Sequence, residues 1–187
     1  KEASMRVRAA LDQRGIELVT AAGVTEVAMD GREASFADGS STSADIIATV
    51  PVHKIPDIVA DSGVAGGKPW IPVNKATLET STSNVFAIGD VNVVPSGDFA
   101  IPKAGVFAAG QGTKVGEIIA SRINQSDQPA PYDGIGFCYI AYSGGRSATV
   151  SGEFLAEGGP QTILSDPTVS GMKSKHRFER DWRSFKI

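Results

Sequence analysis

Residues 84–90 carry an acidic side chain at the end of an apolar run. They read Asn-Val-Phe-Ala-Ile-Gly-Asp, and such a run predicts a parallel strand with Asp90 at its carboxyl end. Open α/β sheets bind their ligands at that end of their strands. The carboxylate is a hydrogen-bond acceptor, and Gly89 allows the backbone to approach a ligand closely. Both residues are therefore candidates for ligand binding.

Cys138 is the single cysteine of the chain, so no internal disulfide forms. It lies within residues 132–139, which read Tyr-Asp-Gly-Ile-Gly-Phe-Cys-Tyr. Such a thiol is either a buried strand residue that behaves as a small hydrophobe or an accessible redox-active group. His53 and His176 are isolated and have no ligand partner at metal-binding spacing, so no metal site is expected.

A helix rich in glycine is expected over residues 103–123. Gly105, Ala109, Gly112 and Gly116 fall at positions i, i+4, i+7 and i+11, so small side chains line one of its faces. Each glycine in a helix interior costs roughly 0.5 to 1 kcal/mol relative to alanine. Close packing against this face should offset that cost, whether it comes from a neighbouring helix, a sheet backbone or a flat cofactor.

The remaining elements alternate between helix and strand. Residues 44–50 are almost continuously apolar, which predicts a buried parallel strand. Turn residues separate paired β runs and predict two hairpins, 24–29 with 33–36 and 135–142 with 147–154. Further expected elements are a helix over 3–14, a β run over 16–19, a helical turn over 55–61, an extended run over 70–73 and a short helix around 178–182.

Composition excludes some classes of function. The chain has 187 residues, 41% of them hydrophobic, and can bury a core. Its net charge of −3 provides no basic field for phosphates, so a nucleic-acid partner is not expected. No apolar stretch reaches the length of a membrane span, and the first residues do not form a secretory signal.

Residues 80–90 resemble the second FAD fingerprint of the pyridine nucleotide-disulfide oxidoreductase superfamily. The pattern is a threonine, a spacer and then an apolar strand ending in Ala-x-Gly-Asp. In that superfamily the aspartate accepts hydrogen bonds from the ribityl hydroxyls of FAD. The resemblance therefore implies that Thr80, Gly89 and Asp90 bind FAD.

Three further segments, residues 50–56, 67–73 and 101–105, resemble sulfide:quinone oxidoreductases and the flavoprotein subunit of flavocytochrome c sulfide dehydrogenase. The resemblance implies that Lys103, Ala104 and Gly105 open a helix whose positive end faces the flavin pyrimidine edge. The alternative for Lys103 is a solvated cap residue. Cys138 resembles the more C-terminal of the two redox cysteines in the sulfide-oxidising members, which implies a catalytic thiol.

The resemblance implies an α/β fold, a fragment of a Rossmann-like flavoprotein with two dinucleotide-binding domains plus a C-terminal interface region containing a β-hairpin. The expected divisions are a partial NAD-like domain over 1–75, part of the FAD-binding domain over 76–125 and the interface region over 126–187. The Gly-x-Gly-x-x-Gly loop that receives the FAD pyrophosphate is absent from the sequence. The missing N-terminal half of the same protein is therefore an expected partner, and the fragment alone is expected to be inactive.

Three functions stay open on the sequence. The first is an FAD-dependent oxidoreductase that passes electrons from sulfide or a similar donor to quinone or cytochrome c. The second is a flavoprotein like the type II NADH:quinone dehydrogenases, and the third is an inert truncated module that self-associates as a homo-oligomer. The basic, aromatic tail is compatible with peripheral contact with a membrane. The sequence does not decide whether the protein lies in the cytoplasm or in the periplasm.

Overall fold

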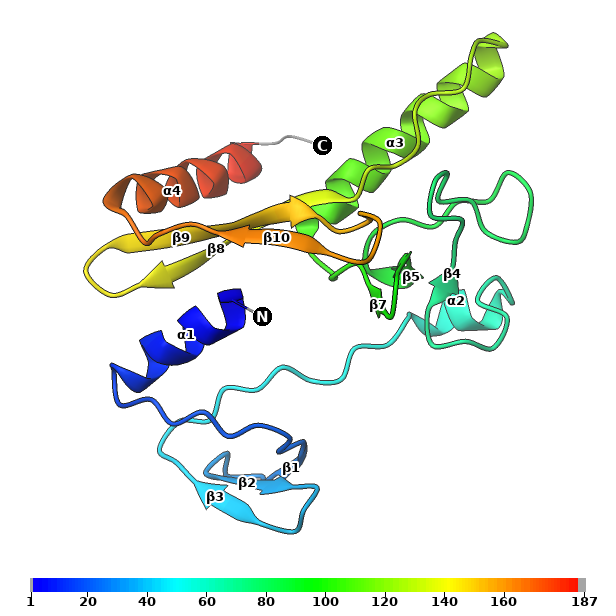
Figure 1. Cartoon of the computed structure of the whole chain (residues 1–187). Helices are drawn as coiled ribbons and strands as arrows, with labels where there is room; N and C mark the ends of the chain where they lie inside the picture. Colours follow the sequence, from blue (N-terminus) through cyan, green and yellow to red (C-terminus); the bar gives the residue numbers. More distant parts are fainter. Residues whose placement is uncertain (1, 185–187) are drawn as a thin grey trace. The chain divides into compact units, whose positions relative to one another are not determined.

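The chain contains both helices and strands, and it divides into two compact units. The structure, a computed structural model, describes residues 2–184. Its compact units are Lys1–His53 and Lys54–Ile187, and Figure 1 shows the elements of each. The expected boundaries at residues 75 and 125 separate dinucleotide-binding domains, which need not coincide with compact units. These boundaries remain a prediction.

The first unit is a helix followed by a small antiparallel meander. Helix α1 (Glu2–Asp12) precedes strands β1 (Val24–Val27), β2 (Glu33–Phe36) and β3 (Ser41–Ser43), which pair in chain order. The side chain of Asp30 accepts a hydrogen bond from the Arg32 amide at 3.0 Å and so closes the turn between β1 and β2. The expected hairpin is confirmed, and β3 adds a strand that the sequence pattern did not predict.

Two strands predicted in the first unit do not form. Residues 44–50 lie outside any strand, and Ile46 and Val50 are 85% and 82% exposed. Residues 16–19 are not in a strand either, and Val19 is exposed. A strand requires a ladder of hydrogen bonds to a neighbour. Within the described residues each run makes a single backbone hydrogen bond, from the Ala44 amide to the Arg32 carbonyl at 2.9 Å and from the Ile16 amide to the Leu11 carbonyl at 3.1 Å. Apolar sequence alone was therefore a wrong indicator of a paired strand here.

The second unit begins with short elements, one of which contains the Gly-Asp pair. They are α2 (Asp57–Asp61), β4 (Ile71–Pro72), the 3₁₀ turn η1 (Gly89–Val91), β5 (Asn92–Val93), β6 (Pro95–Ser96) and β7 (Phe99–Ala100). Strand β4 pairs with β5 in parallel, and β6 pairs with β7 in antiparallel fashion.

The prediction of a strand over residues 84–90 was wrong. In this run only Phe86 forms a bridge, with Glu79. The chain then turns at Gly89, whose φ of +70° is left-handed and ends the extended backbone. Parallel pairing begins after this turn, at Asn92. Asp90 therefore lies in a short turn that leads into a parallel strand, not at the end of one.

Helix α3 (Gly105–Asn124) confirms the predicted glycine-rich helix. One face is buried through residues spaced three or four apart. The opposite face carries the small side chains, and Gly105, Ala109 and Gly116 are exposed there. The buried residues are Phe107, Gln111, Val115, Ile118 and Ser121.

A three-stranded antiparallel sheet and a helix complete the second unit. The sheet has the order β10 (Gln161–Leu164), β9 (Arg146–Glu153) and β8 (Ile135–Tyr142), which confirms the predicted second hairpin. Helix α4 (Val169–Ser184) is longer than expected and lies along this sheet (Figure 1). The ring of Phe178 from α4 packs against Phe137 and Tyr139 of β8. None of the helices in residues 2–184 has the length and apolar character needed to cross a membrane.

The main core packs α3 against the sheet and the short strands. Gly136 on β8 makes room for Phe107, because a β-carbon at this glycine would lie 2.1 Å from the Phe107 ring. Phe107 also meets the ring of Phe154 edge to face, with centroids 4.9 Å apart. The buried residues of this core are Leu78, Val94, Ile101, Phe107, Val115 and Tyr132.

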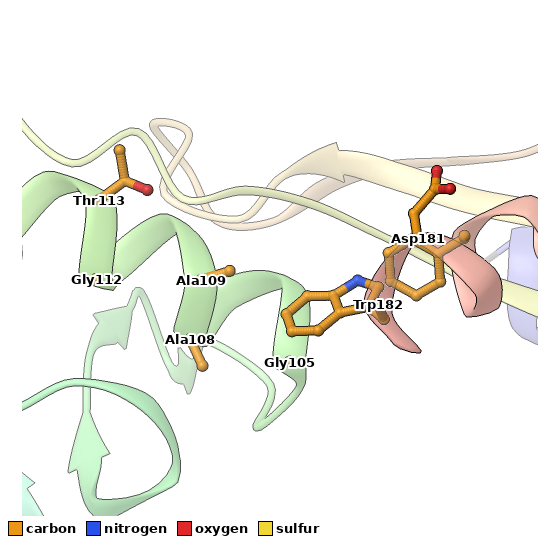
Figure 2. Close-up of a pocket in the computed structure, with 8 residues that line it drawn as sticks. Gly105, Ala108, Ala109, Gly112, Thr113, Asp181 and Trp182 are labelled. Carbon is orange, nitrogen blue, oxygen red and sulfur yellow. The ribbon is translucent and has the colours of Figure 1, made fainter. Parts of the chain in front are cut away.

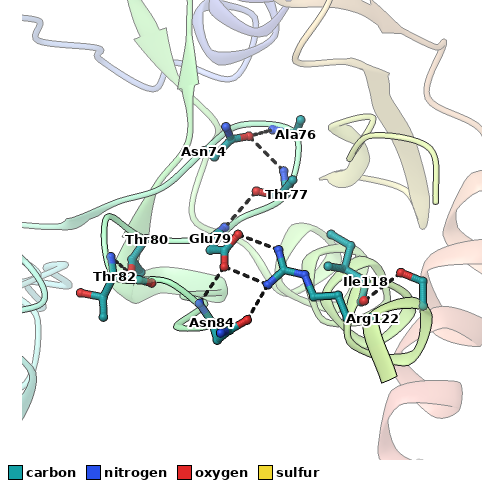
Figure 3. Close-up of polar contacts among 10 residues, drawn as sticks. Asn74, Ala76, Thr77, Glu79, Thr80, Thr82, Asn84, Ile118 and Arg122 are labelled. Atoms are coloured by element: carbon teal, nitrogen blue, oxygen red, sulfur yellow. Dashed lines mark hydrogen bonds and ion pairs between the residues drawn. The ribbon is translucent and has the colours of Figure 1, made fainter. Parts of the chain in front are cut away.

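An ion pair fastens the loop at residues 79–84 to α3, as Figure 3 shows. Arg122 donates to both carboxylate oxygens of Glu79 at 2.9 and 2.7 Å, and it also donates to the Asn84 side chain. The Asn84 amide donates to Glu79 as well, at 2.7 Å. The hydrogen bonds from Arg122 and then from Asn84 lower the pKa of Glu79 to about 2.

This pair predicts a loss of stability in acid. Because the folded-state pKa of Glu79 is depressed to about 2, its contribution is fully present above the unfolded pKa of about 4.3 and disappears as the pH falls toward 2. We expect Glu79→Gln to reduce the free energy of unfolding by about 1 kcal/mol at pH 6. The difference from the wild type should shrink as the pH approaches 2.5 in thermal unfolding.

Glu157 offers a matched control, because it is exposed and forms no ion pair with any residue of 2–184. Glu157→Gln should follow the wild type at every pH. A constant difference between wild type and Glu79→Gln from pH 6 to 2.5 would contradict the assignment.

Candidate functional site

The turn at Gly89 and Asp90 presents a free carboxylate. Position 89 favours glycine for two reasons. Its φ of +70° is left-handed, and a β-carbon here would lie only 3.4 Å from the Ala108 side chain of α3. Asp90 is exposed, and within residues 2–184 its carboxylate accepts no hydrogen bond. The turn therefore holds an unused anionic acceptor close to the small-residue face of α3.

A buried amide network holds this turn from beneath. The Gln111 side-chain oxygen accepts hydrogen bonds from the Gly89 amide at 2.7 Å and from Asn92 Nδ2 at 3.0 Å. Asn92 Nδ2 also donates to the Ala87 carbonyl at 2.8 Å. Gln111 and Asn92 are 3% and 4% exposed. Sequence reasoning missed both residues, although a glutamine on the apolar face of α3 was a detectable signal.

Lys103 holds the same turn from the side of α3. Its ammonium donates to the carbonyls of Asp90 and Asn92, both at 2.7 Å, and lies 3.7 Å from the centroid of the Trp70 ring. Burial lowers the pKa of Lys103, and the nearby Asp90 charge opposes this shift. Lys103 is thus a clamp on the turn, a role that differs from a freely solvated cap. Its contact with a flavin edge remains a prediction.

An apolar groove runs along the small-residue face of α3 (Figure 2). Its volume is about 650 Å³. From α4, the indole of Trp182 reaches toward Gly105 (Figure 2), where a β-carbon would lie 4.0 Å from the ring. The groove is lined by Gly105, Ala108, Ala109, Gly112 and Thr113 of α3 and by Phe178, Asp181 and Trp182 of α4.

A second cavity, of about 370 Å³, contains the thiol. Cys138 is exposed, so the alternative of a buried strand cysteine does not hold. The cavity is also lined by Ala104 and Gly105, and it shares Gly105, Phe178 and Trp182 with the groove. The structure therefore brings Cys138 together with two of the three residues predicted at the helix start. Its redox role remains a prediction.

Thr80 lies apart from these cavities, within the loop that Arg122 fastens. Its hydroxyl oxygen accepts a hydrogen bond from the Thr82 amide at 3.1 Å and donates to the Thr82 carbonyl at 3.2 Å. It lines neither the groove nor the thiol cavity. The hydroxyl thus closes a local turn, and a direct contact of Thr80 with FAD remains a prediction.

The start of α3 is free to receive an anionic or polar group. Its N-cap residue, Ala104, provides no side-chain hydrogen bond, and the first turn contains no acidic residue. The first backbone N–H groups of a helix have no partner within the helix, and the helix dipole makes this end positive. Together with the free Asp90 carboxylate and the glycine-lined groove, this end suits a flat ligand that bears hydroxyl groups and acquires negative charge.

Comparison with known proteins identifies the family. A family profile described as pyridine nucleotide-disulphide oxidoreductase matches residues 1–117. No curated protein matches the chain. The fold is similar to that of the sulfide:quinone oxidoreductase from the hyperthermophilic bacterium Aquifex aeolicus, with a TM-score of 0.75 and 19% identity over 94% of this chain and 43% of that one.

Two other solved structures share the fold. A ferredoxin reductase from Rhodopseudomonas palustris has a TM-score of 0.56 and 23% identity, covering 82% of this chain and 37% of that one. An NAD-dependent persulfide reductase from A. fulgidus has a TM-score of 0.53 and 22% identity, covering 79% and 27%. The chain thus spans less than half of each of these proteins.

The predicted fold class is confirmed, since the chain is a part of a Rossmann-like flavoprotein fold that ends in a hairpin-containing region. The profile covers more than half of the 187 residues. This chain belongs to the pyridine nucleotide-disulphide oxidoreductase family, whose members are flavin-dependent oxidoreductases.

Proposed function

We propose that this chain is part of an FAD-dependent oxidoreductase that passes electrons from sulfide or a similar donor through the flavin to quinone or cytochrome c. The observation that carries the proposal is the free Asp90 carboxylate beside the small-residue face of α3. Two proteins of similar fold are named for sulfide and persulfide chemistry, which supports a sulfur donor.

The residues present fit FAD in three ways. Asp90 would accept hydrogen bonds from the ribityl hydroxyls, and the glycines of α3 would let the flavin approach the helix backbone. The N–H groups that follow Ala104 would stabilise negative charge on the reduced flavin. When bound, the flavin supplies the two-electron redox chemistry, while these residues bind and orient it.

Cys138 is the proposed contact for the electron donor. It lies in a cavity that reaches the start of α3, so its thiol is close to the helix end assigned to the flavin. Chemistry by a cysteine pair needs a second thiol, because Cys138 is the only cysteine among the 187 residues. The proposal therefore includes another polypeptide segment that carries the partner cysteine.

We assign that segment to an N-terminal part of the same protein. It would also supply the Gly-x-Gly-x-x-Gly loop that the sequence lacks. Apolar side chains on residues 46–52 support this assignment, since Ile46, Val50 and Val52 are 85%, 82% and 97% exposed. Burying them against further strands would remove apolar surface from water, and residues 44–50 would then pair as their composition predicts.

The proposal is tested on the protein expressed at its full natural length. We expect a yellow flavoprotein whose flavin is bleached rapidly by sulfide and much more slowly by NADH in stopped-flow experiments. Rapid bleaching by NADH alone would instead identify a type II NADH:quinone dehydrogenase. A colourless protein that self-associates, as measured by light scattering, would identify an inert module.

Cys138→Ser is expected to abolish bleaching by sulfide, because a hydroxyl cannot take the place of a thiolate in sulfur transfer. The FAD content should change little, because serine is close to cysteine in size and Cys138 does not line the cavity at the Asp90 turn. The control is Ser151→Ala, at an exposed position of β9. Sulfide bleaching that persists at the wild-type rate would remove Cys138 from the mechanism.

A further inference from the structure

We propose that Gln111 is the positioning residue for the flavin-binding carboxylate: its buried side chain fixes the left-handed turn at Gly89 and thereby directs Asp90 toward the ligand. This inference rests on the proposed function, because it concerns how Asp90 meets a flavin. It extends that function to a residue of α3 that lies 22 positions from Gly89 along the chain.

The orientation of the Gln111 amide follows from its two partners. The Gly89 N–H and Asn92 Nδ2 are both donors, at 2.7 and 3.0 Å from the same atom. Only the carbonyl oxygen of Gln111 accepts from both. Asn92 is itself fixed by its second bond, to the Ala87 carbonyl. The side-chain oxygen therefore contacts both sides of the Gly89–Asp90 turn.

The conformation of the turn must be fixed by other residues, because glycine has no strong backbone preference of its own. Gly89 populates positive and negative φ about equally in the absence of other contacts. Its N–H reaches Gln111 in the left-handed turn, and a partly buried donor left without a partner is unfavourable. Lys103 acts on the other side of the chain by binding the carbonyls of Asp90 and Asn92. These two residues bind the backbone of the turn and leave the Asp90 carboxylate free.

The place of Gln111 in α3 supports a specific role. It lies between Phe107 and Val115 on the buried face of the helix, where an apolar side chain would pack without any need for a hydrogen-bond partner. Gln111 has one further polar neighbour, the buried Tyr132 hydroxyl, which has no hydrogen-bond partner within the described residues. The hydrogen bonds of the Gln111 side-chain oxygen both lead to the turn at Gly89, which supplies a reason for a polar residue at this position.

The test separates positioning from general stability through Gln111→Met and Gln111→Glu. Methionine keeps the length and volume but removes the acceptor, and glutamate keeps the acceptor. The first readout is amide hydrogen exchange of the 187-residue chain, measured by NMR. In Gln111→Met we expect the Gly89 amide to exchange at least about tenfold faster, while the amides of Val115 and Ile118 keep their protection. Glutamate should restore the protection of Gly89.

Two results of the exchange experiment would overturn the proposal. The Gly89 amide could stay protected in Gln111→Met, or it could lose protection together with Val115 and Ile118, which would make Gln111 an ordinary core residue. The second readout is the FAD affinity of the full-length protein, for which we expect a loss of about tenfold in Gln111→Met and recovery in Gln111→Glu. Unchanged FAD affinity in Gln111→Met would also overturn it. If Asp90→Asn leaves the affinity unchanged, the flavin assignment fails instead, and the exchange data alone decide the role of Gln111 in the turn.

Discussion

Asp90→Ala is expected to weaken FAD binding by about 10- to 100-fold. A hydrogen bond to a charged group contributes about 1.5 to 3 kcal/mol, and each 1.4 kcal/mol corresponds to a factor of ten in affinity. The Asp90 carboxylate accepts no hydrogen bond within residues 2–184, so its removal breaks no hydrogen bond there and takes away only its charge near Lys103. The thermal midpoint of the apoprotein should therefore stay close to that of the wild type.

Asp98→Ala is the matched control for this prediction. Asp98 is also exposed and also lies in a glycine-containing turn, between β6 and β7. Its loss removes the same charge without touching the Gly89 turn. Flavin fluorescence titration should rank the affinities of wild type and Asp98→Ala as equal, with Asp90→Ala far weaker. Equal affinity in all three proteins would remove Asp90 from the FAD site.

Gly152→Ala is expected to give the largest loss of stability, about 3 kcal/mol, the upper end of the usual range for overpacking. A β-carbon at Gly152 would lie 2.0 Å from the Gln161 carbonyl oxygen and 2.8 Å from Thr162 Cα. Both atoms belong to the backbone of β10, which pairs with β9 at this point. The strands would have to separate, because backbone atoms cannot rotate away as a side-chain end does.

Urea unfolding measures this effect, with Ser151→Ala as the control. Ser151 is the neighbouring residue of β9 and is exposed, so its change should shift the free energy of unfolding by at most about 0.5 kcal/mol. An unfolding midpoint of Gly152→Ala equal to that of Ser151→Ala would show that β9 and β10 do not pair as described.

Features that depend on nearby residues were predictable from the sequence. The period of small and apolar residues fixes the two faces of α3, and turn residues separate β8 from β9. The Gly-Asp pair was recognisable as a candidate for ligand binding because glycine allows close approach and aspartate accepts hydrogen bonds, but the sequence placed it at a strand end and not in a turn. The family resemblance then followed from the spacing of Thr80 to Asp90.

Features that depend on distant partners were not predictable. Residues 44–50 and 84–90 have the composition of buried strands but are not in strands. A strand needs a neighbouring strand to pair with, and the composition of a segment does not reveal whether such a neighbour is present. Gln111 gains its role from Gly89 and Asn92, which lie 22 and 19 residues away. The contacts of Lys103 were not predictable either, because its ammonium binds the carbonyls of Asp90 and Asn92, which lie 13 and 11 residues away.

The chain contains two tryptophans, and both lie at the candidate site. Trp70 lies beneath the Lys103 ammonium, and Trp182 stands over Gly105 where the groove meets the thiol cavity. A chromophore that enters the groove would take up their excitation energy. The ultraviolet fluorescence of these two tryptophans should therefore decrease when a chromophore occupies the groove, so binding can be followed without an added label.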